Sequence, residues 1–333
     1  MPQKLLQDFL FQQIKEKLAP QITLVDAVAA SLYISIDSAY RRIRGETPLI
    51  LEEVQQLCKE YKISLDRLLN VEGNATIFQV VQVDNKDYSF ERYLTGLLQG
   101  LRQLQSYKSK EIFYLTKDLA IFHLFCYRPV FAFRYFFWMK SILQHPDFTN
   151  RSFNMDCLPP KIEDMGKSLL RIYNEIPSVE IWNNECINST MAQIEYYREA
   201  GFFKNPDDIK IIYEGVKDTI EHIKNQAEIG CKYLPEEKPD LKKENFCFYQ
   251  NRVVLSDNTI LVLHDGAKTL YLNYDVLNYM VTRDEKLCED VHLKMQNLMR
   301  RATILSTVSE KQRNIFFYTL LKKIPNYSKT LQQ

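Results

Sequence analysis

Apolar side chains in the first 70 residues recur every three or four positions in five short blocks, the spacing of amphipathic helices. The first block ends before Pro20, because proline cannot continue a helix. Thr23, followed three residues later by Asp26, is a helix-start signal and predicts a second helix over residues 24–32. A third helix is predicted to begin after Ser35, which can accept a hydrogen bond from a free amide. Two further helices are predicted over residues 49–61 and 64–69.

The third predicted helix lies in "SIDSAYRRIRG", residues 35–45, and carries three arginines. Helical spacing assigns four residues to its buried face: Ile36, Ala39, Tyr40 and Ile43. The exposed face is then predicted to carry Asp37, Ser38 and Arg41, with Arg42 and Arg44 on its two flanks. Such a row of arginines can contact a polyanion, or it can remain solvated and pair with nearby acids such as Asp37 and Glu46.

The order of five short helices, with a very short turn between the second and third, resembles the phage-repressor (Cro-like) helix-turn-helix family. The residues that carry this resemblance are "VAASLYIS" (28–35), "SAYRRIRG" (38–45) and "ISLDRLL" (63–69), within a match over residues 3–70. One position departs from the family pattern. Tyr33 stands where the turn commonly has glycine, and a bulky side chain is strained at positive φ.

The resemblance implies that the third helix enters the major groove of double-stranded DNA. Ser38 and Arg41 would then read base edges, and Arg42 and Arg44 would contact the phosphates. Together with Ser35 and Asp37, they form the predicted DNA-binding set. The family resemblance also implies a homodimer on two half-sites.

Charge supports this prediction only locally. Residues 1–70 contain nine Lys and Arg and nine Asp and Glu, so their net charge is zero. Residues 35–45 alone contain three Arg and one Asp, a local charge of +2. Because the net charge of residues 1–70 is zero, the alternative hypothesis is a protein-interaction adaptor whose helix-turn-helix no longer binds DNA.

The remaining chain is predicted to form a linker over residues 71–88, a helical domain over 89–232, a second linker over 233–244 and a small α+β domain over 245–333. The fold class predicted for the whole chain is therefore mainly α. Residues 178–201 are predicted as a single helix after Pro177, Gly96 and Gly100 predict a close helix crossing, and "HDGAK" (264–268) predicts a hairpin turn.

Residues 117–143, "KDLAIFHLFCYRPVFAFRYFFWMKSIL", mix aromatic and basic side chains. They could stack single-stranded nucleic acid, lie on a membrane, or form two buried helices broken near Pro129. Because the aromatic residues occupy almost every helical face, we favour the buried helices. His123 and Cys126 share one helical turn, but two ligands without a third do not predict a metal site.

Motifs for catalysis or cofactors are not found in the sequence. The seven cysteines contain no C-x-x-C spacing, and the chain lacks a glycine-rich phosphate loop, H-E-x-x-H and G-x-S-x-G. We therefore expect no enzyme activity, metal or cofactor. No secretion signal or membrane span is predicted, so we expect a cytoplasmic protein without a membrane partner.

Three stretches beyond residue 70 resemble an uncharacterised family of bacterial helix-turn-helix regulators: residues 89–101, 117–143 and 306–320. That resemblance implies a transcription regulator whose larger, C-terminal part senses an effector or mediates dimerisation. A small molecule or a peptide would suit a pocket among the helices. The polar residues predicted to line it are Tyr196, Tyr197, Trp182 and Arg134.

Overall fold

The protein forms two compact units, Met1–Ile77 and Phe78–Gln333, and each is considered separately. A computed structural model describes residues 3–18, 21–63, 65, 76–81, 90–252 and 257–325. Within these ranges, no helix is both long enough and apolar enough to cross a membrane.

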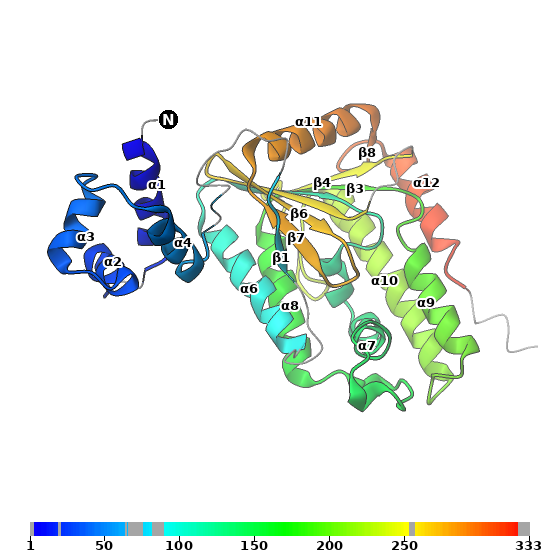
Figure 1. Ribbon diagram of the computed structural model, residues 1–333. Coiled ribbons are helices and arrows are strands. Elements are labelled where there is room, and N and C mark those ends of the chain that lie inside the picture. Colours follow the sequence, from blue (N-terminus) through cyan, green and yellow to red (C-terminus); the bar gives the residue numbers. More distant parts are fainter. Residues whose placement is uncertain are drawn as a thin grey trace, which may run out of the picture. The chain divides into compact units, whose positions relative to one another are not determined.

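The N-terminal unit contains the first four predicted helices (Figure 1). They are α1 (Gln3–Lys15), α2 (Leu24–Leu32), α3 (Ile36–Ile43) and α4 (Leu51–Glu60). The two predicted N-caps are confirmed, because the Asp26 amide donates to Thr23 Oγ1 (3.2 Å) and the Ser38 amide donates to Ser35 Oγ (3.2 Å). Apart from residue 65, the predicted fifth helix lies outside the described residues.

The core of this unit draws small and aliphatic side chains from all four helices, among them Ile14, Val28, Ala39 and Leu57. The side chain of Gln7 on α1 forms hydrogen bonds with the backbone of α3 and of the α3–α4 connection. Its side-chain amide donates to the carbonyl oxygens of Arg42 (2.6 Å) and Thr47 (3.0 Å), and its oxygen accepts from the Leu49 amide (3.0 Å). These bonds, together with Ala39 in the core, hold α3 against the other helices.

The larger unit is built on one mixed sheet with strand order β1-β7-β6-β5-β2-β3-β4-β8. The central strands β2, β3 and β4 run parallel, and every other neighbouring pair is antiparallel. The strands are β1 (Gln79–Val81), β2 (Lys110–Leu115), β3 (Ser178–Trp182), β4 (Phe246–Gln250), β5 (Thr259–His264), β6 (Ala267–Asn273), β7 (Tyr279–Thr282) and β8 (Thr303–Ile304).

Helices cover both faces of this sheet (Figure 1). Ile112 and Tyr114 of β2 face the larger core, whereas Phe113 and Leu115 face the smaller core beneath α11 (Glu285–Arg301), as expected from strand alternation. The larger core is shared by α6 (Phe90–Ser106), α7 (Arg128–Phe137), α8 (Pro160–Glu175), α9 (Asn188–Glu199), α10 (Asp207–Ile229) and α12 (Glu310–Leu321), with short 3-10 and π segments such as η1 (Ile121–Phe125) and η2 (Trp138–Ile142).

The sheet overturns the predicted fold class. The chain is not mainly helical with a small α+β unit, because strands from residues 89–232 and from residues 245–333 belong to the same eight-stranded sheet. Residues 233–244 therefore do not separate two domains. The segment predicted as one helix after Pro177 is strand β3 followed by α9. Strand β2 ends in four consecutive buried residues, so it lacks the alternating pattern that identifies a strand. Strand β3 alternates polar and apolar residues but is only five residues long and follows a proline that resembles a helix start.

Other predictions for the larger unit are confirmed. Residues 117–143 contribute most of their aromatic side chains to the core, and α7 begins with Pro129 in its first turn. The predicted hairpin joins β5 to β6, with Asp265 and Gly266 both at positive φ (44° and 84°), as a type I′ turn requires. Within the predicted linker, Gln79–Val81 form strand β1, which pairs with β7.

Candidate functional site

The turn between α2 and α3 consists of three residues and depends on Tyr33. This residue has φ 55° and ψ 41°, the left-handed conformation that glycine usually takes, and its side chain is 90% exposed. The Ile34 amide donates to the Ala29 carbonyl (3.1 Å) and closes the turn. Tyr33 therefore adopts the conformation despite its side chain and presents a phenol beside the start of α3.

The exposed face of α3 differs from the predicted one. Ile36 and Tyr40 were expected in the core, but they are 47% and 46% exposed. Of the four predicted core residues, only Ala39 is fully buried. A unit of about 70 residues has too little interior to bury the whole apolar side of a short helix. The exposed residues of α3 and its C-cap are Ile36, Asp37, Tyr40, Arg41 and Arg44, and this set is called the α3 face below.

Two residues predicted on the outer side of α3 are turned towards the protein. Ser38 is half-buried, and its hydroxyl accepts from that of Ser35 (2.9 Å). Arg42 forms a two-pronged ion pair with Glu53 of α4, with N–O distances of 3.1 and 2.7 Å. Arg42 also donates to the Ser38 carbonyl (3.3 Å). Arg42 thus joins α3 to α4, and its predicted position on an exposed flank was wrong.

Arg41 and Arg44 remain accessible, with side-chain exposures of 60% and 68%. Glu46 lies 3.9 Å from Arg41 and 3.8 Å from Arg44, distances that indicate loose surface pairing. The Arg44 guanidinium also lies over the Tyr40 ring, 5.7 Å from its centroid. Because Asp37 and Glu46 offset the two arginines, the α3 face has two accessible cations but little net charge nearby.

Arg42 therefore gives a stability prediction. We expect Arg42→Ala to lower the stability of α3 and α4 by about 1 to 3 kcal/mol, because it leaves the half-buried Glu53 carboxylate without its partner. Hydrogen exchange of the amides in residues 36–60, followed by mass spectrometry on the full chain, measures this loss. Arg41→Ala is the matched control and should leave exchange nearly unchanged. Equal acceleration in both variants would contradict the structural role of Arg42.

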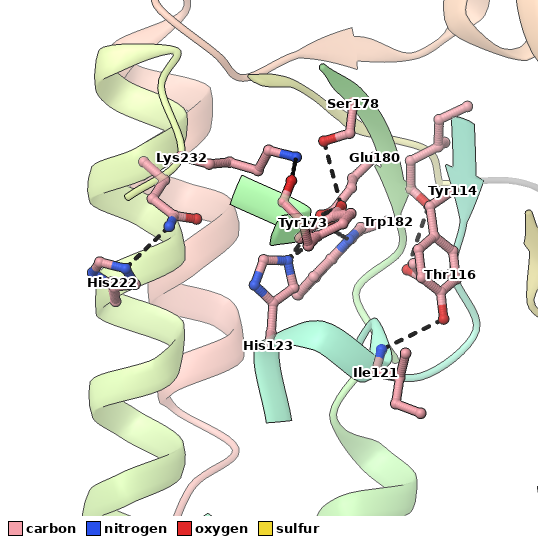
Figure 2. Close-up of polar contacts among 12 residues, drawn as sticks. Tyr114, Thr116, Ile121, His123, Tyr173, Ser178, Glu180, Trp182, His222 and Lys232 are labelled. Carbon is pink, nitrogen blue, oxygen red and sulfur yellow. Dashed lines mark hydrogen bonds and ion pairs between the residues drawn. The ribbon is translucent and has the colours of Figure 1, made fainter. Parts of the chain in front are cut away.

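The larger unit contains a buried polar cluster centred on Glu180 of β3 (Figure 2). The cluster consists of Glu180, His123, Tyr173 and Trp182 and is called the Glu180 cluster. The Glu180 carboxylate contacts His123 Nε2 (2.8 and 3.0 Å) and accepts from Tyr173 Oη (2.5 Å) and Trp182 Nε1 (2.7 Å). Burial by itself raises the pKa of Glu180, but the charge and hydrogen bond of His123 and the Tyr173 hydroxyl outweigh it and lower that pKa. The carboxylate is therefore held ionised inside the core.

Lys232 lies next to this cluster and is 3% exposed. Its ammonium donates to the carbonyl oxygens of Tyr173 (2.8 Å) and Ile176 (2.6 Å), which lie at the C-terminal end of α8. It also lies 3.7 Å from the centroid of the Tyr173 ring. Burial lowers the pKa of Lys232 to about 7, although Glu180 opposes the shift.

Every side chain of the Glu180 cluster is buried, and its hydrogen bonds are directed at other core groups. His123, noted in the sequence for its nearness to Cys126, is instead bound to a carboxylate 57 residues away. The hydrogen bonds connect β3, η1 and α8, so we interpret the Glu180 cluster as a structural network that holds these three elements together. It was missed from the sequence because the partners are far apart in the chain.

Of the four residues predicted to line a pocket, Arg134 lines the pocket that α6 forms with the segment after β2, and the other three are not in its lining. Trp182 belongs to the Glu180 cluster, Tyr197 is buried and bonded to Ser141 (2.6 Å between hydroxyls), and Tyr196 is exposed. The predicted close crossing at Gly96 and Gly100 is also absent: a Cβ atom added at either residue would meet no described atom within 4 Å. Both glycines instead line the same pocket as Arg134.

The chain was compared with protein-family models, with curated proteins and with solved structures, and none of the three comparisons gave a match. Functional assignment therefore depends on surfaces that a partner could reach, among them the α3 face and the pocket around Arg134.

Proposed function

We propose that the protein is a sequence-specific, double-stranded DNA-binding regulator of transcription that acts in the cytoplasm. The observation that carries the proposal is the α3 face, a short helix that follows a three-residue turn and exposes Arg41 and Arg44 beside Tyr40. This arrangement is consistent with the resemblance to Cro-like regulators. The larger unit would sense an effector or mediate dimerisation.

In this proposal the α3 face lies in the major groove. Arg41 would donate two hydrogen bonds to the O6 and N7 atoms of a guanine, and Asp37 would accept from the exocyclic amine of a cytosine. Ile36 and Tyr40 would pack against thymine methyl groups, which gives their exposure a purpose. Arg44 would contact a phosphate, while Ser35 and Ser38 would cap and orient the helix.

Charge sets the expected strength of binding. Glu46 and Asp37 offset Arg41 and Arg44, so one copy of the unit would neutralise few phosphates and bind non-specific DNA weakly. Two copies on neighbouring half-sites would double the contacts, and the homodimer stays a prediction for this reason.

The decisive experiment selects duplexes from a random-sequence library with the full chain and then measures affinity for the selected site. We expect Arg41→Ala to weaken binding by about ten- to a hundredfold, equivalent to about 1 to 3 kcal/mol, and to relax preference at one base pair. Arg41→Lys should lose the same preference but keep the salt dependence, because it retains the charge without the two-pronged donor.

Lys59→Ala, which removes an exposed cation from α4, is the control for a general loss of charge. Preference unchanged in Arg41→Ala, or no selected sequence at all, would contradict the proposal.

The adaptor alternative has its own supporting observation. Besides Ile36 and Tyr40, the start of α4 exposes Ile50 (57%) and Leu51 (69%), and exposed apolar side chains grouped in one small unit are typical of protein interfaces. If the chain is an adaptor, Leu51→Ser should abolish co-purification of a protein partner from native cells, and Arg41→Lys should leave it intact. Selection of a defined duplex by the wild-type chain would favour the DNA-binding proposal instead.

A further inference from the structure

The larger unit contains a pocket of about 460 Å³, within the size range of small-molecule sites. It lies between α6, the segment that follows β2, the start of η2, and the β6–β7 connection. Its lining extends from exposed residues, Gly96 and Val276, to the buried Arg134 and Trp138. The pocket therefore leads from the surface to two polar side chains in the core.

These two side chains have donors that the protein does not use. Arg134 is 5% exposed, and its Nη1 donates to Gln193 Oε1 while its Nη2 lies 3.6 Å from Asp118 Oδ2. Arg134 Nε and Trp138 Nε1 are both buried, and neither has a hydrogen-bond partner among the described residues. The Arg134 guanidinium carbon is 5.5 Å from the centroid of the Trp138 indole, so the two side chains are neighbours in the core.

A buried donor without an acceptor costs about 1 to 3 kcal/mol, and more when it belongs to a cation. Asp118 compensates incompletely, because 3.6 Å exceeds hydrogen-bond distance and its Oδ1 accepts from the Leu119 amide (2.9 Å). A single carboxylate has two oxygen acceptors and could accept from Arg134 Nε and Trp138 Nε1 together.

The walls of the pocket favour a ligand that is mostly apolar. Most of the wall is aliphatic or aromatic, with side chains that include Leu97, Leu119, Ile121, Phe122, Ile260 and Val276. Gly96 and Gly100 of α6 leave open space at the wall where larger side chains would fill it. A fully polar ligand would leave this surface without favourable contacts.

We propose that this pocket binds a small apolar molecule with one carboxylate, which accepts hydrogen bonds from Arg134 Nε and Trp138 Nε1. This proposal specifies the effector expected for the larger unit, but its test measures ligand binding alone. It can therefore fail while DNA binding holds, and DNA binding can fail while it holds.

The two tryptophans make the test direct. The chain contains Trp138 and Trp182 only, and Trp182 Nε1 already donates to Glu180. Full-length protein with ¹⁵N-labelled tryptophan gives two indole N–H signals, and Trp138→Phe assigns them. Titration with decanoate and with 2-naphthylacetate should move the Trp138 signal downfield and leave the Trp182 signal in place. Calorimetry on the same samples gives the dissociation constants.

Variants separate the pocket from general effects. Arg134→Met should weaken binding of the acids by about tenfold or more. Gly96→Leu should abolish binding without disrupting α6, since a Cβ at this residue meets open space. Thr95→Leu adds the same side chain at an exposed neighbouring position outside the pocket, so it should bind like wild type.

Three outcomes would overturn the proposal. The first is the absence of binding by both acids at millimolar concentration. The second is a shift of both indole signals to the same extent. The third is equal affinity for the acids and their methyl esters, because an ester cannot supply the charge that Arg134 is proposed to recognise.

Discussion

Glu180→Ala is expected to lower the free energy of unfolding of the larger unit by about 2 to 6 kcal/mol, a large part of the stability of an ordinary domain. The substitution leaves the buried donors of His123 and Trp182 without their acceptor, and Tyr173 keeps only its contact with the Ser178 hydroxyl (3.3 Å). Each unsatisfied group costs about 1 to 3 kcal/mol, and no water can reach the site because all four side chains are buried.

Chemical denaturation followed by far-ultraviolet circular dichroism measures this effect on the full chain. Glu180→Gln keeps the size and one oxygen acceptor, so its loss should be smaller. Glu175→Ala is the control, because Glu175 lies near the end of α8 and forms only an exposed pair with Lys243. A stable Glu180→Ala protein with a wild-type midpoint would show that the network is dispensable.

The Glu180 cluster also shows where sequence reasoning stops. The 3.6-residue period identified α10 because its buried positions recur with helical spacing, whereas α7 was identified by apolar residues on almost every face after Pro129. Strand β3 alternates polar and apolar residues, but all five are buried, Ser178 and Glu180 included, and the proline before it resembles a helix start. Its carboxylate is satisfied by residues from η1 and α8, a pairing that no local pattern encodes.

The helices of the N-terminal unit were predicted more accurately than the strands of the larger unit, because the residues that begin a helix lie next to it in the sequence. The caps at Thr23 and Ser35 act within three residues, so the boundaries of α2 and α3 followed directly from the sequence. The direction in which α3 faces did not follow. The Arg42–Glu53 pair spans two helices and holds Arg42 inwards, and Ile36 is exposed.

The proposed ligand pocket had a weak sequence signal. Arg134 is the one basic residue within the buried stretch 130–137 of α7, and a buried cation of this kind requires a partner. Gly96 and Gly100 were correctly singled out but wrongly interpreted, because the space beside them is left open instead of being filled by a second helix. A glycine pair on a helix therefore predicts missing volume without indicating what fills it.

Lys232 gives the second large prediction, a dependence of stability on pH. Burial lowers the pKa of Lys232 to about 7 from its ordinary value of 10.5. Between these values the unfolded chain binds a proton that the folded chain does not, so this residue makes stability rise with pH. The expected slope is roughly 1 kcal/mol per pH unit between about pH 7 and 10, and Lys232 contributes no slope below that window because both states are then protonated.

Other buried groups titrate in the same window with the opposite sign. Burial raises the pKa of the Cys186 thiol and of the Tyr173 phenol, so these groups make stability fall as the pH rises. The contribution of Lys232 is therefore isolated as the difference between wild type and Lys232→Met, measured by denaturation at several pH values. Methionine keeps most of the side-chain volume and removes the charge.

We expect the free energy of unfolding of Lys232→Met to exceed that of wild type by the largest amount near pH 7, where wild type still carries the penalty of a buried ammonium. This difference should decrease towards pH 10. Lys242→Met is the control, because Lys242 is exposed and lies in the same α10–β4 connection. Its free energy of unfolding should depend on pH in the same way as that of wild type. A constant difference between wild type and Lys232→Met across the window would mean that the ammonium stays protonated throughout. In that case its two carbonyl contacts at the end of α8, at 2.8 and 2.6 Å, must outweigh the loss of water around it.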